Sequence, residues 1–245
     1  MRSVWQTEFQ VRSYESDRSG ELKPQALLNY FEEAAQQHAR ELGFGYEQLK
    51  LDNRFWVLAR IEVAINRLPA WGEAVRVETW PKSVSRLFAI RDFLLHDGEE
   101  TPLVRATSAW LLMDGSAARP LRPEKHLPQG PLRDNAEKSA MDAVPEKLSF
   151  PSEDGELLES LNVQFSDIDV NNHVNNSVYL KWLDDAVRTG EPDVRPAAFN
   201  INFLREAAIG TRVNLLRSTE KRSLLEVRSQ QDEALTRARI DYRPR

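Results

Sequence analysis

Four polar residues in the C-terminal part of the sequence are of the types that carry out acid–base chemistry. Asp169, Asn171 and His173 alternate along the segment DVNNH, and Glu206 follows Arg205 further along the chain. If the first segment is extended, residues two apart face the same side, so a carboxylate, an amide and an imidazole would share one volume. Asp169 could then orient the imidazole, and Asn171 could bind a carbonyl oxygen or a water.

A helix is predicted directly after this segment, because its apolar residues recur at every third or fourth position. They are Val178, Tyr179, Trp182, Leu183 and Ala186, and we assign this face to the protein core. Asn175 or Asn176 is the natural N-cap. The free N–H groups of the first helical turn would suit a developing oxyanion beside the polar segment.

The sequence contains two similar copies of one unit. IEVAINRLPAWGEAVRV (61–77) aligns with FNINFLREAAIGTRVNL (199–215) without a gap, at an offset of 138 (199 − 61). LVRATSAW (103–110) matches LTRARIDY (235–242), and the segment 16–34 matches 166–186 with a two-residue length difference. Each copy predicts one strand, one long helix and four further strands.

This element order predicts an α+β fold. A single helix after the first strand must be covered by the sheet, so each repeat is expected to be an antiparallel sheet wrapped around one long helix. Two such repeats can pair edge to edge as a pseudo-dimer. The predicted boundaries are 1–118 for the first repeat, 119–150 for a linker rich in proline and charge, and 151–245 for the second.

The first copy serves as an internal comparison for the polar residues. Leu68 stands where the second copy has Glu206, and the segment RSGELKP (18–24) has no histidine or asparagine. Taken singly, asparagines before a helix are commonly caps, and a glutamate at a strand end is commonly surface. Their joint absence from one copy predicts a single active site, in the C-terminal repeat.

Composition excludes several classes of function. The chain has 245 residues, a formal net charge of −5 and no cysteine, which argues against nucleic-acid binding, disulfides and a cysteine nucleophile. The four histidines show no metal-ligand spacing, so neither a metal nor another cofactor is expected. No apolar stretch is long enough to span a membrane, and the N-terminus has no signal core, so a cytoplasmic protein is predicted.

The segments DIDVNNHVNN and YLKWLDDA resemble the signature of hotdog-fold thioesterases. More narrowly, nearly the whole chain resembles the fatty acyl-ACP thioesterases of plants and bacteria, which carry two hotdog repeats, and the lack of a plastid extension points to the bacterial type. The resemblance implies that Asp169, Asn171, His173 and Glu206 are catalytic. Plant members often have a cysteine after the glutamate, where Ala207 stands here, so a mechanism that needs that thiol cannot operate.

The implied reaction is hydrolysis of fatty acyl thioesters on acyl carrier protein, the expected partner, to free fatty acid. Either Glu206 or His173 could be the base, with Asn171 polarising the carbonyl and Asp169 holding its neighbours. An apolar pocket in the first repeat would take the acyl chain, with Phe55, Trp56 and Trp110 as candidate walls. The alternatives are an acyl-CoA thioesterase and a non-catalytic acyl-binding protein of the same fold. A homodimer is an open alternative for the assembly.

Overall fold

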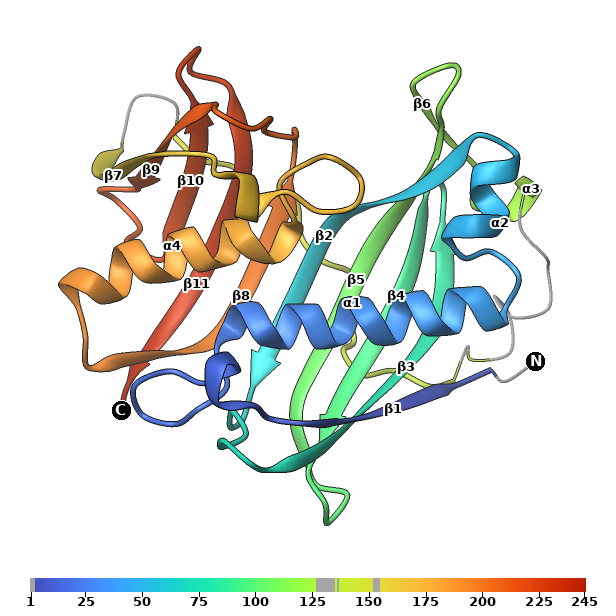
Figure 1. The fold of residues 1–245 in the computed structure, drawn as a ribbon, viewed down its shortest axis with the longest axis horizontal. Helices are drawn as coiled ribbons and strands as arrows, with labels where there is room; N and C mark the ends of the chain where they lie inside the picture. Colours follow the sequence, from blue (N-terminus) through green and yellow to red (C-terminus); the bar gives the residue numbers. More distant parts are fainter. Residues whose placement is uncertain (1–2, 127–134, 136, 152–154) are drawn as a thin grey trace. The chain divides into compact units, whose positions relative to one another are not determined.

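The computed structural model describes residues 3–126, 135, 137–151 and 155–245 of the chain. The chain divides into two compact units, Met1–Pro145 and Glu146–Arg245 (Figure 1). Each unit contains one long helix lying across a mostly antiparallel sheet, which confirms the predicted α+β repeat.

The first unit has five principal strands in the order β1 (Trp5–Gln10), β3 (Ala74–Ser85), β4 (Phe88–His96), β5 (Pro102–Asp114) and β2 (Arg54–Ile65). All neighbouring pairs are antiparallel, and the short β6 (Arg119–Leu121) pairs with β5. The 3-10 turn η1 (Ser13–Glu15) leads to α1 (Pro24–Glu41), and the short helices α2 (Tyr46–Leu51) and α3 (Pro123–His126) follow.

The second unit repeats this order. Its strands run β7 (Glu156–Asn162), β9 (Arg212–Arg217), β10 (Leu224–Ser229), β11 (Ala234–Pro244) and β8 (Val194–Phe203) across the sheet. The 3-10 turn η2 (Phe165–Asp167) leads to α4 (Asn176–Gly190). Turns at 97–100 and 230–233 join β4 to β5 and β10 to β11, so each of these pairs is a hairpin.

Both long helices form where the sequence places them, for local reasons. Pro24 occupies the first turn of α1, where its missing N–H costs nothing. The side-chain oxygen of Asn175 accepts a hydrogen bond from Ser177 N and caps α4. Each helix turns its apolar face to the sheet, and Phe31 of α1 stacks on Phe93 of β4 with ring centroids 4.8 Å apart. Burial of a large apolar side chain such as Phe31 stabilises the fold by about 1.5–3 kcal/mol.

Matching hydrogen bonds align the two units more accurately than the sequences do. Asp17 N donates to Glu21 O at 2.8 Å, and Asp169 N donates to His173 O at 2.9 Å. The offset is 152 (169 − 17), and the same offset relates Ala34 to Ala186 within the helices. The predicted two-residue length difference is therefore wrong, since the segment from η1 through α1 aligns with its copy without a gap.

The offset falls to 138 only after the helices. Gly72 N donates to Val11 O at 2.9 Å, and Gly210 N donates to Val163 O at 3.0 Å, which confirms the gapless second block (210 − 72 = 138). From the start of α1 to the end of β2 the first unit thus has 14 more residues (152 − 138) than the second has from the start of α4 to the end of β8. This insertion contains α2.

The unit boundary, between Pro145 and Glu146, falls within the predicted linker 119–150, and the described residues on each side of it bond within their own unit. Trp80 Nε1 donates to Lys138 O at 3.1 Å and Ala140 N donates to the buried Asp92 at 2.7 Å, in the first unit. Leu148 N donates to Asn202 Oδ1 at 2.7 Å, in the second unit. Residues 127–134 and 136 of the predicted linker lie outside the described residues.

Candidate active site

His173 and Glu206 meet in the second unit. His173 Nε2 lies 2.8 Å from Glu206 Oε2, and the two side chains are 44% and 54% exposed. His173 belongs to the loop between η2 and α4, and Glu206 lies just beyond the end of β8. The fold therefore joins the two sequence elements that were missing together from the first copy, and it leaves both side chains open to water.

The loop that carries His173 is a tight turn. Asn172 has a φ of 63°, and Ile168 and Val174 form an isolated antiparallel bridge across the turn. Asp169 Oδ1 accepts a hydrogen bond from Asn171 N at 2.8 Å, as in an Asx turn, and Asn171 Nδ2 lies 3.4 Å from Asp169 Oδ2. The prediction of an extended segment with three side chains on one face is wrong, because a left-handed residue reverses the chain inside it.

The role expected for Asp169 changes accordingly. Its carboxylate contacts Asn171, whereas the imidazole of His173 is contacted by Glu206. Asp17, at the equivalent place in the first unit, accepts hydrogen bonds from Ser19 N at 2.8 Å and Glu21 N at 3.3 Å. Because the first unit keeps this aspartate and its turn but lacks the histidine, we assign Asp17 and Asp169 to holding the shape of the loop, each in its own unit.

The start of α4 offers less to an oxyanion than the sequence suggested. Ser177 N donates to the Asn175 side chain at 2.8 Å, and Val178 N donates to Asn175 O at 2.9 Å. These two first-turn donors are thus used in capping the helix. Asn171 is exposed on the preceding loop, and its side-chain amide can donate a hydrogen bond to a bound group besides the long one that it makes to Asp169 Oδ2.

The two units differ in the backbone hydrogen bonds between the loop before the long helix and the residues that follow β2 or β8. In the first unit, Leu22 N donates to Pro69 O at 2.9 Å and Trp71 N donates to Gly20 O at 2.8 Å, which closes the loop over a buried Leu68. In the second unit the corresponding described residues, 172–174 and 207–209, show no such backbone bonds. The opened loop makes room for the Glu206 carboxylate to reach His173.

Tyr179 was assigned to the core from its helical spacing, and the structure gives it a polar contact as well. Its side chain is 2% exposed, and its hydroxyl accepts a hydrogen bond from Ala207 N at 3.0 Å. Burial raises the pKa of Tyr179 to about 12, with a smaller contribution from the charge of Glu206. Helical periodicity alone cannot reveal this contact, because the spacing of Tyr179 is that of any core residue.

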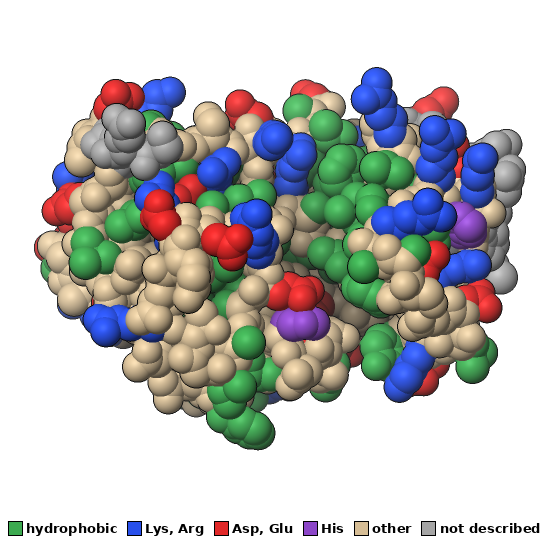
Figure 2. All heavy atoms as spheres, turned by 90° about the horizontal axis from the view of Figure 1, so that it is seen from above, with side chains coloured by type: hydrophobic (Ala, Val, Ile, Leu, Met, Phe, Trp, Pro, Cys, Tyr) green, Lys and Arg blue, Asp and Glu red, His purple; other side chains and the backbone are tan. Residues whose placement is uncertain are grey.

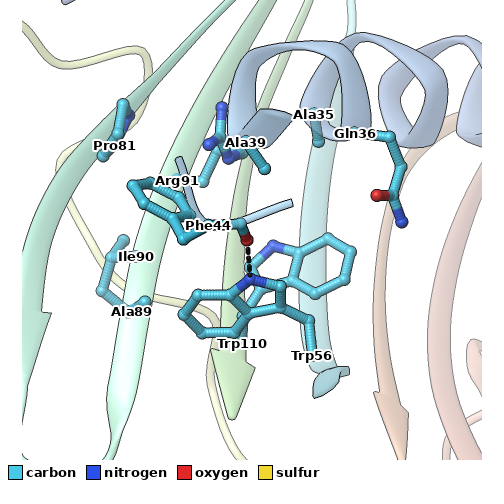
Figure 3. Close-up of a pocket in the computed structure, with 10 residues that line it drawn as sticks. All are labelled: Ala35, Gln36, Ala39, Phe44, Trp56, Pro81, Ala89, Ile90, Arg91 and Trp110. Carbon is cyan, nitrogen blue, oxygen red and sulfur yellow. Dashed lines mark hydrogen bonds between the residues drawn. The ribbon is translucent and has the colours of Figure 1, made fainter. Parts of the chain in front are cut away.

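A pocket lies inside the first unit, between α1 and strands β2, β3, β4 and β5 (Figure 3). The space between these residues amounts to about 510 Å³, a volume that includes open solvent. It is lined by Ala35, Gln36, Ala39, Phe44, Trp56, Pro81, Ala89, Ile90, Arg91 and Trp110. Phe44 comes from the insertion that contains α2, and its carbonyl accepts from Trp56 Nε1 at 3.1 Å.

Two of the three predicted pocket residues line this space. Trp56 and Trp110 do, whereas Phe55 does not and is 40% exposed. Trp56 and Phe55 are neighbours on β2, so their side chains point to opposite faces of the sheet. Phe55 is therefore corrected to a surface residue of the strand.

Arg91 is the one charged residue that lines the pocket. Its side chain is buried, and its Nη1 lies 3.1 Å from His38 Nδ1 and 3.2 Å from Thr79 Oγ1. No carboxylate of the described residues pairs with it. Burial lowers the pKa of Arg91 to about 10, so the guanidinium remains charged at neutral pH in largely apolar surroundings.

Models of the two domains of acyl-ACP thioesterases match the chain. The N-terminal domain model covers residues 2–127, and the C-terminal domain model covers residues 152–244.

The chain belongs to the acyl-ACP thioesterase family.

Known structures show the same double hotdog fold. An acyl-ACP thioesterase from Bacteroides thetaiotaomicron superposes with a TM-score of 0.89 at 24% identity, covering 98% of each chain. The 12:0-ACP thioesterase from Umbellularia californica gives a TM-score of 0.83 at 25% identity, covering 100% of this chain and 99% of that one. The predicted family and its two-repeat α+β fold are thus confirmed.

Curated relatives include the chloroplastic palmitoyl-acyl carrier protein thioesterase of Gossypium hirsutum, 30% identical over 74% of this chain and 46% of its own length. The chloroplastic acyl-[acyl-carrier-protein] hydrolase FATB3 of Cuphea viscosissima is 32% identical over the same shares. The chain spans about half the length of these curated relatives.

Among the residues of this thioesterase family member that the structure describes, no group of three or more histidine, cysteine, aspartate or glutamate side chains is placed to hold a metal ion. None of its described helices is both long and apolar enough to cross a membrane. Basic and acidic side chains are interspersed over the face drawn in Figure 2.

Proposed function

We propose that this protein hydrolyses fatty acyl thioesters of acyl carrier protein, releasing free fatty acid and the carrier thiol. The observation that carries the proposal is the 2.8 Å contact between His173 and Glu206. This contact exists only in the second unit, because Glu21 and Leu68 occupy the equivalent positions in the first. Family membership and the names of the relatives support acyl carrier protein as the partner.

The His173–Glu206 pair can activate a water. With Nε2–H of His173 donating to Glu206 Oε2, His173 Nδ1 and Glu206 Oε1 remain as acceptors that no described residue occupies. A water bound to either atom gives up a proton to the pair as its oxygen attacks the thioester carbonyl carbon. The C–S bond then breaks, and the proton passes from the pair to the departing sulfur.

The oxyanion that forms in this attack needs a hydrogen-bond donor. The side-chain amide of Asn171 is exposed on the same loop as His173, and its position is fixed by the Asp169 turn. We assign Asn171 to the carbonyl oxygen and Asp169 to the loop that presents Asn171 and His173. Water supplies the nucleophile, so no cofactor is needed.

The pocket of the first unit is our candidate for the acyl chain. Its walls are mostly apolar and include Trp56 and Trp110, which suits a hydrocarbon chain. The inserted segment that supplies Phe44 is absent from the second unit, so the first unit has gained a pocket where it lacks the polar pair. We propose that one repeat holds the chain and the other carries out hydrolysis.

Two other functions compete with this one. An acyl-CoA thioesterase would use the same polar pair with a different thiol carrier. A non-catalytic acyl-binding protein would use the pocket alone, but that function gives no reason for a water-accessible imidazole–carboxylate pair confined to one repeat.

The test is to assay the purified protein with acyl-ACP and acyl-CoA substrates of several chain lengths while measuring the released thiol. We expect turnover with acyl-ACP to exceed that with acyl-CoA, and His173→Ala to lower kcat by about 10²-fold or more. Ala89→Phe, which adds bulk to the pocket wall, should shift preference to shorter chains. Absence of thiol release from every substrate by folded protein would leave only the binding function.

A further inference from the structure

The hydrogen bond between Tyr179 and Ala207 connects the central helix of the second unit to the segment that carries Glu206. The Tyr179 hydroxyl accepts from Ala207 N at 3.0 Å, and both residues are 2% exposed. Ala207 directly follows Glu206 in the chain. This bond therefore fixes the backbone next to the carboxylate that contacts His173.

The first unit lacks both partners of this bond. At the offset of 152 Tyr179 corresponds to Leu27, which has no hydroxyl, and at the offset of 138 Ala207 corresponds to Pro69, which has no N–H. Elsewhere the two units keep matching hydrogen bonds around the same loop. The bond is thus confined to the repeat that holds the His173–Glu206 pair, whereas a bond needed for the fold would be expected in both.

The open loop of the second unit explains why such a bond is needed. In the first unit, backbone hydrogen bonds between the 20–22 and 69–71 segments hold the strand end in place. The second unit lacks those bonds among its described residues, which leaves space for Glu206. The backbone between Arg205, whose N–H donates to Leu235 O, and Gly210, whose N–H donates to Val163 O, therefore has fewer restraints than in the first unit. The hydroxyl of Tyr179, which belongs to α4, restrains this backbone through its hydrogen bond with Ala207 N.

We propose that Tyr179 is a positioning residue for the reaction, which holds Glu206 at contact distance from His173 through the backbone of Ala207. This inference rests on the proposed function, because it assigns a role to a residue behind that site. The tyrosine itself does not touch the reacting atoms.

The surroundings of Tyr179 make its hydroxyl a rigid anchor. Its ring packs edge-on against Trp182 and Phe203, with centroid distances of 5.2 and 6.1 Å. Because burial keeps its pKa high, at about 12, the hydroxyl stays protonated throughout the neutral range. A phenylalanine would keep the ring contacts and remove only the oxygen.

The deciding experiment compares Tyr179→Phe with Tyr30→Phe. Tyr30 is a matched control, since it is also a buried helical tyrosine, its hydroxyl donates to Glu15 at 2.6 Å, and it lies in the first unit. For each variant we would measure kcat, KM for acyl-ACP and the melting temperature.

We expect Tyr179→Phe to lower kcat by about tenfold or more, since displacement of a catalytic group by about 1 Å can cost up to roughly 10²-fold. KM for acyl-ACP should change by less than about twofold, because Tyr179 does not touch the reacting atoms. Tyr30→Phe should leave both kcat and KM unchanged, although it also loses one hydrogen bond.

The proposal is overturned if Tyr179→Phe keeps kcat within about twofold of the wild type, or if its loss matches that of Tyr30→Phe. A fall in rate that only follows the fraction of unfolded protein would also overturn it. Glu206→Gln, assayed in parallel, distinguishes a failure of the positioning role of Tyr179 from a failure of the catalytic role proposed for Glu206. If Glu206→Gln is inactive and Tyr179→Phe is fully active, only the positioning role fails, whereas an active Glu206→Gln variant overturns both.

Discussion

Exchanging the residues at the equivalent positions 68 and 206 should separate activity from stability. Glu206→Leu gives the second unit the residue of the first, and Leu68→Glu does the reverse. We expect the first substitution to abolish turnover with little loss of stability, and the second to lower stability without creating another site. Position 68 lies just after the end of β2, and position 206 lies at the same distance after the end of β8, so the two substitutions are made at equivalent places in the fold.

The expected effect of Glu206→Leu follows from exposure. Glu206 is 54% exposed and its partner His173 is 44% exposed, and a polar contact this open to water contributes only about 0–1 kcal/mol to stability. Loss of a group that assists proton transfer lowers the rate by roughly 10²–10⁴-fold. At 1.36 kcal/mol for each factor of ten, this raises the barrier by about 3–5 kcal/mol.

The expected effect of Leu68→Glu is the opposite. Leu68 is 6% exposed, so the change removes about 1.5–3 kcal/mol of apolar burial. It also places a carboxylate where the closed loop of the first unit excludes water, at a further cost of a few kcal/mol. No activity is expected from the new carboxylate, because Glu21 stands at the position of the required histidine.

Thiol release from acyl-ACP and urea unfolding, measured on the same preparations, provide the assay. The reasoning is refuted if folded Glu206→Leu protein turns over at a rate near that of the wild type, since Glu206 would then have no part in the chemistry. Equal stability of Leu68→Glu and the wild type would show that the loop of the first unit is open to water, contrary to the structure.

Three further predictions concern the loop, the pocket and the carrier. Asp169→Ala and Asp17→Ala should each cost about 1–2 kcal/mol in urea unfolding, because both carboxylates hold the same turn. Only Asp169→Ala should also lower kcat, and Asp169→Asn, which keeps the acceptor oxygen, should retain more activity. Arg91→Met should raise the free energy of unfolding at pH 7. The lowering of the Arg91 pKa from 12.5 to about 10 corresponds to a cost of about 3 kcal/mol for burying the charge, which the methionine would not have. The loss of the two hydrogen bonds of Arg91 would offset part of this gain. Because the native pKa is the lower one, that cost lessens only as pH rises above about 10, and a less stable Arg91→Met variant in urea at pH 7 would contradict this. Turnover of acyl-ACP should fall with added salt while that of acyl-CoA changes less, because acyl carrier protein is acidic and docking would use local basic side chains; equal salt dependence would argue against charge-guided docking.

Local sequence patterns were sufficient for the two long helices and the principal strands of this protein, although not for the short elements α2, α3 and β6. The three-to-four-residue spacing in α1 and α4, the cap at Asn175 and the hairpin turns depend on residues close in the chain, so they can be recognised without the fold. The comparison of the two copies was also informative, because Leu68 opposite Glu206 needs only an alignment. That comparison placed the candidate active site in one repeat.

The alignment itself was correct only where the residues remained similar. Asp17 was matched two residues away from Asp169, because sequence identity is low around the turn. The hydrogen bonds restored the match, since backbone geometry is kept where side chains change. With that correction, Asp169 belongs to the loop that both units share, and the chemistry that we propose for the second unit rests on His173, Glu206 and Asn171.

The contacts that make the site depend on tertiary structure. His173 meets Glu206 because the helix loop and the end of β8 lie together in space, a long-range contact that neither local segment encodes. Tyr179 looked like any core residue until the fold placed Ala207 N against its hydroxyl. Trp56 lines the pocket and its neighbour Phe55 does not, because adjacent strand residues point to opposite faces of the sheet and only one face is covered by the helix. The sequence by itself determined which residue types were available and in which repeat, and only packing of distant segments decided which of them touch.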